Sequence, residues 1–186
     1  MKTMQAGIRP AAMILVGTMG FVILLVACSD SPRAVAPIEH KLAATAPQFT
    51  ASSGSQSTLL GRATFAERFK IKRTTGDWTM EIHAKDPLDV AVQSITFQPG
   101  AQSGWHSHPG PVFIQVVSGT MTFYESDDPG CSPIVRTAGQ GYLDAGDHAH
   151  IARNESSAPA TNVVTYFAPP GAALRIDEPA PGNCPF

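Results

Sequence analysis

After about residue 58, the chain consists mostly of short stretches that are apolar or that alternate between apolar and polar residues. Closely spaced turn signals separate these stretches, and this pattern restricts the fold more than any other feature of the sequence. The turn signals are rich in Gly, Pro, Asp and Ser, as in the segments 74–77, 98–104 and 126–130. No stretch has the apolar period of an amphipathic helix of three turns. Many short strands between Gly/Pro turns are typical of a β-sandwich or β-barrel. We therefore predict an all-β domain with strands in the segments 58–65, 78–84, 89–97, 112–125, 141–145, 148–154 and 161–168.

Residues 1–27 have the layout of an export signal peptide. Lys2 and Arg9 precede an apolar run over 11–27. The segment LVAC at 25–28 resembles the bacterial lipobox, which implies cleavage before Cys28 and lipidation of that cysteine. The alternative is an uncleaved anchor, although about 17 apolar residues are marginal for spanning a bilayer. Both interpretations place the rest of the chain in the cell envelope, outside the cytoplasm.

The remainder divides into a tether and one domain. Residues 28–58 are rich in Ser, Ala, Pro and Thr and lack an apolar period, so we expect a flexible tether. Residues 59–186 are long enough for one domain with a hydrophobic core. The net charge of −2 and the pI near 6.3 give no electrostatic signature of nucleic-acid binding. Membrane attachment is therefore expected through the lipid only.

Two cysteines are left if Cys28 carries lipid. Cys131 and Cys184 would then lie in an oxidising compartment, where disulfides persist. A disulfide would hold the end of the chain, which otherwise frays. Two free thiols, or a thiol ligand to a metal, are the alternatives.

Two pairs of histidines have the spacing of neighbours on one face of a strand. His106 and His108 are separated by one residue, and so are His148 and His150. Alternate side chains of a strand project to the same face, so each pair is predicted to point one way. One such pair chelates a metal but does not complete a site. Further ligands must come from another part of the fold.

The first pair lies in a segment that resembles a motif of the cupin family, G-x5-HxH-x3-4-E-x6-G. Gly100, His106, His108 and Gly119 match the motif in register. The sequence departs from it at the glutamate, where Val112 stands, or Phe113 if the gap has four residues.

The second cupin motif, G-x5-PxG-x2-H-x3-N, is matched more loosely. Gly146, His150 and Asn154 fit with one extra residue in the loop, and Asp144 replaces the proline. The spacing to Asn154 favours His150 over His148 as the third histidine. The resemblance covers roughly residues 60–184 and implies a double-stranded β-helix, or jelly-roll, barrel.

The resemblance implies a divalent transition metal on His106, His108 and His150, with His148 as an additional candidate. Three imidazoles suit Fe, Zn, Mn, Ni or Cu, and the thiol dioxygenases of this superfamily resemble the chain in using three histidines. A carboxylate ligand would require another residue, and the candidates are Asp144, Asp147 and Glu125.

Two functions remain open on this basis. The first is a metal-dependent, dioxygenase-like enzyme acting on a small anionic or chelating molecule. The second is a non-catalytic envelope module that binds a metal or small ligand, since cupins host unrelated activities. The resemblance also allows a homodimer formed through sheet edges.

Overall fold

The computed structural model describes residues 49–186, and this part of the chain is built from strands. No helix within it has the length and hydropathy of a membrane span. The expected signal peptide, Cys28 and most of the expected tether lie outside the described residues. The strands are β1 (Ser53–Phe65), β2 (Phe69–Thr75), β3 (Trp78–Ala84), β4 (Leu88–Gln102), β5 (His106–Ser107), β6 (Val112–Ser118), β7 (Thr120–Glu125), β8 (Ile134–Thr137), β9 (Gly141–Asp144), β10 (His150–Arg153), β11 (Ala160–Ala168) and β12 (Ile176–Asp177).

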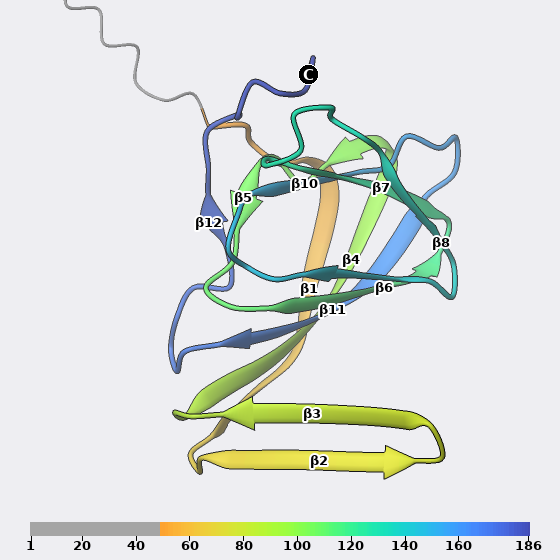
Figure 1. Ribbon diagram of the computed structural model, residues 1–186. Helices are drawn as coiled ribbons and strands as arrows, with labels where there is room; N and C mark the ends of the chain where they lie inside the picture. The colour runs from red at the N-terminus through yellow and green to blue at the C-terminus, as the bar shows by residue number, and fades with distance from the viewer. Residues whose placement is uncertain (1–48) are drawn as a thin grey trace, which may run out of the picture. The chain divides into compact units, whose positions relative to one another are not determined.

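Ten strands form one antiparallel sheet that folds into a nearly closed barrel (Figure 1). One side of the barrel has the strand order β1-β4-β11-β6-β9, and the other has the order β12-β5-β10-β7-β8. The two sides are joined where β10 pairs with the end of β4. Strands β2 and β3 form a separate hairpin, which extends beyond the barrel in Figure 1. This architecture confirms the predicted all-β, double-stranded β-helix fold.

Strand β4 changes sides through an irregular segment near Gly100. Its pairing with β1 jumps from Phe97 to Gln102 across this segment, which is a bulge in the ladder. Gly100 has φ of 77°, in the left-handed region that glycine tolerates best. The predicted turn at 98–104 is thus partly strand, because β4 continues through the bulge and directs the chain toward His106.

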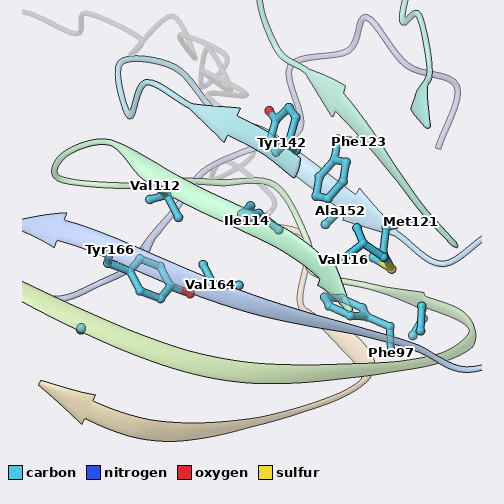
Figure 2. Packing of buried hydrophobic residues seen from close by; sticks show 13 residues of the cluster. Phe97, Val112, Ile114, Val116, Met121, Phe123, Tyr142, Ala152, Val164 and Tyr166 are labelled. Carbon is cyan, nitrogen blue, oxygen red and sulfur yellow. The ribbon is translucent and has the colours of Figure 1, made fainter. Parts of the chain in front are cut away.

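Alternation along the strands separates the core from the outer surface. In β6 the buried side chains are Val112, Ile114 and Val116, whereas the residues between them are exposed. The main core cluster also includes Phe123 and Tyr142, whose rings stack with centroids 4.1 Å apart (Figure 2). This period of two is what a half-buried antiparallel strand requires.

Several elements differ from the sequence expectations. The predicted strand 112–125 is two strands, because Gly119, with φ of 74°, turns the chain between β6 and β7. Strands β2 and β8 were not predicted, since their polar residues hide the alternation. Strand β1 begins at Ser53, before the expected domain boundary at residue 59, because even its polar first residues pair with β4.

Asp89 joins three distant segments near the start of β4. Its carboxylate accepts hydrogen bonds from Thr64 (2.5 Å), Arg62 (2.7 Å) and the backbone N–H of Gly171 (2.9 Å). The hydrogen bonds from Thr64 and Gly171, together with the Arg62 charge, lower the pKa of Asp89 to about 2. The carboxylate thus connects β1 and β4 to the segment after β11.

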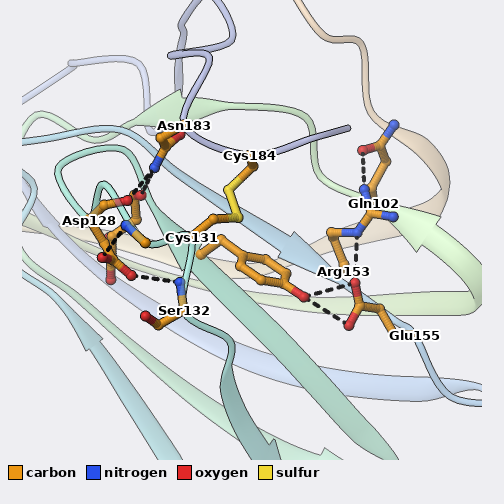
Figure 3. The surroundings of a disulfide bond; sticks show 11 residues. Gln102, Asp128, Cys131, Ser132, Arg153, Glu155, Asn183 and Cys184 are labelled. Atoms are coloured by element: carbon orange, nitrogen blue, oxygen red, sulfur yellow. Dashed lines mark hydrogen bonds and ion pairs between the residues drawn. A yellow bond between two sulfur atoms is a disulfide. The ribbon is translucent and has the colours of Figure 1, made fainter.

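A disulfide links Cys131, in the loop after β7, to Cys184 near the end of the chain (Figure 3). The Cα atoms are 5.2 Å apart. Asn183 adds hydrogen bonds from its side-chain amide to the backbone carbonyls of Glu125 (2.8 Å) and Asp128 (2.6 Å). Both sulfurs pack against a small cluster of Trp105, Tyr124 and Ile151 that is separate from the main core. The C-terminal segment is therefore held against β7 and β10.

We predict that Cys131→Ser and Cys184→Ser each lower the free energy of unfolding by roughly 3–4 kcal/mol, because opening this loop releases chain entropy in the unfolded state. The sequence separation of 53 residues sets the size of the effect. Urea unfolding of oxidised protein measures it. The double variant should match either single variant, since all three break one bond. Equal stability of wild type with and without reductant would contradict the prediction.

Candidate metal centre

Three histidines meet inside the barrel because β5 pairs with β10. His106 and His150 are direct Cα partners in this pair, and His108 follows two residues after His106. The ring centroids are 4.8 Å (His106–His108), 4.5 Å (His106–His150) and 5.2 Å (His108–His150) apart. One nitrogen from each ring lies within 4.8 Å of the other two. Ser107, between the first two, points away and donates to Glu178 (2.8 Å).

The three rings are buried and are oriented by their Nδ1 atoms. His106, His108 and His150 are 7%, 4% and 1% exposed. Nδ1 of His106 lies 2.8 Å from the carbonyl oxygen of Gly104, and Nδ1 of His108 lies 2.6 Å from that of Leu174. A carbonyl only accepts, so both Nδ1 atoms carry the proton and both Nε2 lone pairs are free. This is the tautomer in which a histidine binds a metal through Nε2.

Burial keeps the imidazoles of His106 and His108 neutral. Burial is the main reason that the pKa of His108 falls to about 4, with the neighbouring His150 as the next cause. The pKa of His106 is lowered further, for the same two reasons. Neutral imidazole is the form that coordinates a metal ion. At ordinary pH His106 and His108 therefore have the protonation state that metal binding requires.

Val112 occupies the position of the motif glutamate and is buried in the core, and its aliphatic side chain has no atom that could bind a metal. The nearest carboxylate belongs to Asp144, whose Oδ2 lies 2.8 Å from Nδ1 of His150 and 3.7 Å from Nε2 of His108. Burial acts to raise the pKa of Asp144, but the interactions with His150, the Gly146 N–H and His108 outweigh it, and the pKa is lowered. Asp144 is therefore a carboxylate at the edge of the site.

The polar atoms of the site are incompletely satisfied. Nδ1 of His150 and Oδ2 of Asp144 are buried, and their relative orientation does not give a well-formed hydrogen bond despite their separation of 2.8 Å. Buried polar atoms without partners are costly unless a ligand or water completes them. Three imidazoles beside one carboxylate are a donor set that suits a divalent transition ion. The buried three-histidine group fits such a metal.

His148, the additional histidine candidate, does not join the other three. Its Nε2 lies 2.8 Å from Glu125, and its Nδ1 lies 2.7 Å from Asp147. Burial acts to lower its pKa, but the hydrogen bonds to Asp147 and Glu125 outweigh burial and raise it. Glu125 also accepts a hydrogen bond from the hydroxyl of Tyr142. Three carboxylate and histidine candidates named from the sequence, Glu125, Asp147 and His148, thus form an ion-paired cluster beside the metal centre.

Asn154, the last residue of the second motif, has a structural role. Its side-chain amide donates to the carbonyls of Phe97 (3.0 Å) and Ala158 (2.8 Å), and its oxygen accepts from Ser156. These bonds close the turn after β10. The residue can position His150 only indirectly, through β10, which ends just before Asn154.

The segment after β11 contributes a backbone carbonyl and a positive charge to the site. No sequence pattern predicted either of them. Leu174 supplies the carbonyl that orients His108, although 66 residues separate them. Arg175 lies close enough for its charge to lower the pKa of both His106 and His108. Its Nε is 2.5 Å from Asp177, which pairs with His106 through β12. No local pattern marks these residues, because they reach the site only through the pairing of β12 with β5.

Comparisons with known proteins agree with this architecture. Residues 93–166 match the family model described as a cupin domain, and this span includes all three histidines. No curated protein matched the sequence.

Three solved structures illustrate the likeness. The cupin domain of an XRE family transcriptional regulator from Enterobacter cloacae is 28% identical, over 44% of this chain and 82% of that chain, with a TM-score of 0.36. The polyketide cyclase RemF from Streptomyces resistomycificus is 11% identical, over 69% and 75%, with a TM-score of 0.46. The DMSP lyase DddQ from Ruegeria pomeroyi is 16% identical, over 47% and 42%, with a TM-score of 0.41. The match of residues 93–166 to the cupin domain model supports placing this chain in the cupin superfamily.

Proposed function

We propose that this protein binds a divalent transition metal through His106, His108 and His150 and acts as a metal-dependent, oxygenase-type enzyme on a small anionic or chelating molecule. The observation that carries the proposal is the convergence of three buried imidazoles, with two Nδ1 atoms held by backbone carbonyls. Imidazoles oriented in this way lose little conformational freedom when they bind an ion.

A metal bound there would supply Lewis acidity or, if redox-active, a place for dioxygen activation. The protein's own residues orient the imidazole rings and determine the polarity around them. The two backbone carbonyls hold the rings, and the surrounding core keeps the site in a medium of low dielectric constant, where charge interactions are strong. Val112 leaves the coordination position of the motif glutamate free, which favours an anionic partner at that position.

Arg175 is the residue best placed to attract that partner. Its positive charge acts on both His106 and His108, and about a third of its side chain is exposed. Of its nitrogens, Nε contacts Asp177. A guanidinium can still offer its outer N–H groups to a carboxylate. We infer that Arg175 lies on the path of a small anion to the histidines.

A non-catalytic binding module is the second candidate. It is favoured by the near-complete burial of the three histidines, which suits retention of an ion, and by the orientation of Ser107 away from them. Oxygen consumption with thiols, diketones or phenols as trial substrates separates the two functions. Turnover by the metal-loaded protein supports the enzyme, whereas binding without turnover supports the module.

We further propose that the protein is exported and lipid-anchored through Cys28, as the segment LVAC and the preceding apolar run suggest.

The homodimer also stays a proposal. Exposed apolar side chains on one face of the β2–β3 hairpin, Ile71, Trp78, Met80 and Ile82, support it, since an isolated hairpin is marginally stable without cover. Mass spectrometry of the mature N-terminus and sedimentation velocity test the two proposals. An unmodified N-terminus or a monomer would contradict them.

We predict that the full chain, purified without a polyhistidine tag, contains close to one metal ion and that His108→Ala loses it, because two imidazoles hold an ion much less tightly than three. Metal analysis by mass spectrometry measures both. His148→Ala is the matched control and should keep the metal, since His148 lies in the ion-paired cluster. Wild type that takes up none of Fe, Zn, Mn, Ni and Cu would contradict the prediction.

We predict that Arg175→Gln weakens binding of oxalate, used as a small dianionic probe, to the metal-loaded protein by about tenfold or more, because a charged hydrogen-bond donor is lost. Calorimetric titration at two salt concentrations measures the loss, and the variant should show the weaker salt dependence. Arg136→Gln, on exposed β8, is the control. Equal oxalate affinity in wild type and Arg175→Gln would rule out this role.

A further inference from the structure

Asp144 lies directly across from the position where the cupin motif lacks its carboxylate. Val112 on β6 and Asp144 on β9 are Cα partners in an antiparallel pair. Side chains of directly opposed residues project to the same face of such a pair. Both side chains are buried, Asp144 to 2% exposed. The carboxylate therefore enters the same side of the barrel as a glutamate at position 112 would.

The contact of Asp144 with the site is made through His150. Oδ2 lies 2.8 Å from Nδ1 of His150, and the other oxygen, Oδ1, accepts from the backbone N–H of Gly146 (2.7 Å). The two nitrogens of an imidazole ring point away from each other. This oxygen therefore lies behind the His150 ring, as seen from a metal bound to Nε2 of His150, and it is also 3.7 Å from Nε2 of His108.

The same arrangement exists at the other two histidines. Each has an oxygen acceptor at Nδ1, from Gly104 for His106 and from Leu174 for His108. Oδ2 of Asp144 lies at a similar distance from Nδ1 of His150 and carries a negative charge, although the two atoms are not aligned as a hydrogen bond. In metal sites an acceptor at the second nitrogen fixes the ring and its tautomer, and a carboxylate there raises the basicity of the ligand.

We propose that Asp144 is a positioning residue of the metal centre: it holds His150 through Nδ1 and supplies from β9 the negative charge that a motif glutamate would supply at Val112. This inference rests on the proposed metal-binding function. In this arrangement the negative charge lies next to Nδ1 of His150, whereas a motif glutamate would bind the metal directly. The site keeps a carboxylate, while the coordination position of the glutamate is left for an external anion.

The test compares Asp144→Asn with Asp147→Asn in the full chain. Both variants remove one carboxylate shortly before His150, but Asp144 ends β9, whereas Asp147 lies in the following loop and contacts His148. Zn²⁺ affinity is measured by competition with a chromophoric chelator. We expect Asp144→Asn to bind Zn²⁺ about 10–100-fold more weakly, as is typical when such a partner is lost. Asp147→Asn should bind like wild type. Equal affinity in wild type and Asp144→Asn would overturn the proposal.

A second readout does not depend on metal. ¹⁵N NMR of the histidine rings in metal-free protein identifies which nitrogen carries the proton. We expect the Nδ1–H tautomer at His150 in wild type, as at His106 and His108, and a changed His150 signal in Asp144→Asn but not in Asp147→Asn. An Nε2–H tautomer at His150 in wild type would overturn the inference, even if Asp144→Asn failed to fold.

The two readouts separate this inference from the proposed function. If wild type binds no metal but the His150 tautomer depends on Asp144, the metal-binding function fails and the positioning contact stands. If wild type binds Zn²⁺ and neither the affinity nor the tautomer responds to Asp144→Asn, the function stands and the inference fails.

Discussion

The antiparallel pairing of β5 with β10 is the constraint on which the candidate site depends. It places His106 opposite His150, and the same register places Glu125 of β7 opposite His150 on the other side of β10. A shift of one residue would turn His150 out of the barrel, because strand side chains alternate between faces. The convergence of the three histidines therefore requires this register. The disulfide and the hydrogen bonds of Asn183, which hold the C-terminal segment against β7, help to fix the same region.

The pKa of a titratable side chain in the barrel depends on its burial and on the polar or charged groups that face it. His106 and His108 are neutral because they are buried, whereas His148, at the edge, is surrounded by carboxylates that raise its pKa. Asp144 stays ionised despite its burial because imidazoles and a backbone N–H face it. His148 and His150 are only two residues apart, but His148 lies in the ion-paired cluster and His150 lies in the three-histidine group. The difference arises from their neighbours and not from their spacing.

Much of this arrangement follows from local rules. Alternation of apolar and polar residues predicted the strands around the site, including β6 and β11, and the HxH spacing predicted that His106 and His108 point together. Where local sequence patterns do not identify a strand, pairing with another strand determines the structure. The polar strands β2 and β8 form because they pair with β3 and β7. The bulge at Gly100 makes a strand of a segment whose composition indicates a turn.

The sequence by itself determined the all-β class, the pair of histidines on one strand face and the absence of a carboxylate at Val112, because each of these depends on neighbouring residues and a period of two. Only the tertiary structure decided which distant groups complete the site. His150 rather than His148 joins the pair, Asp144 lies behind it, and Leu174 and Arg175 arrive from the segment after β11. The physical reason is that strand pairing brings together residues far apart in the chain, and no local pattern encodes the register between them.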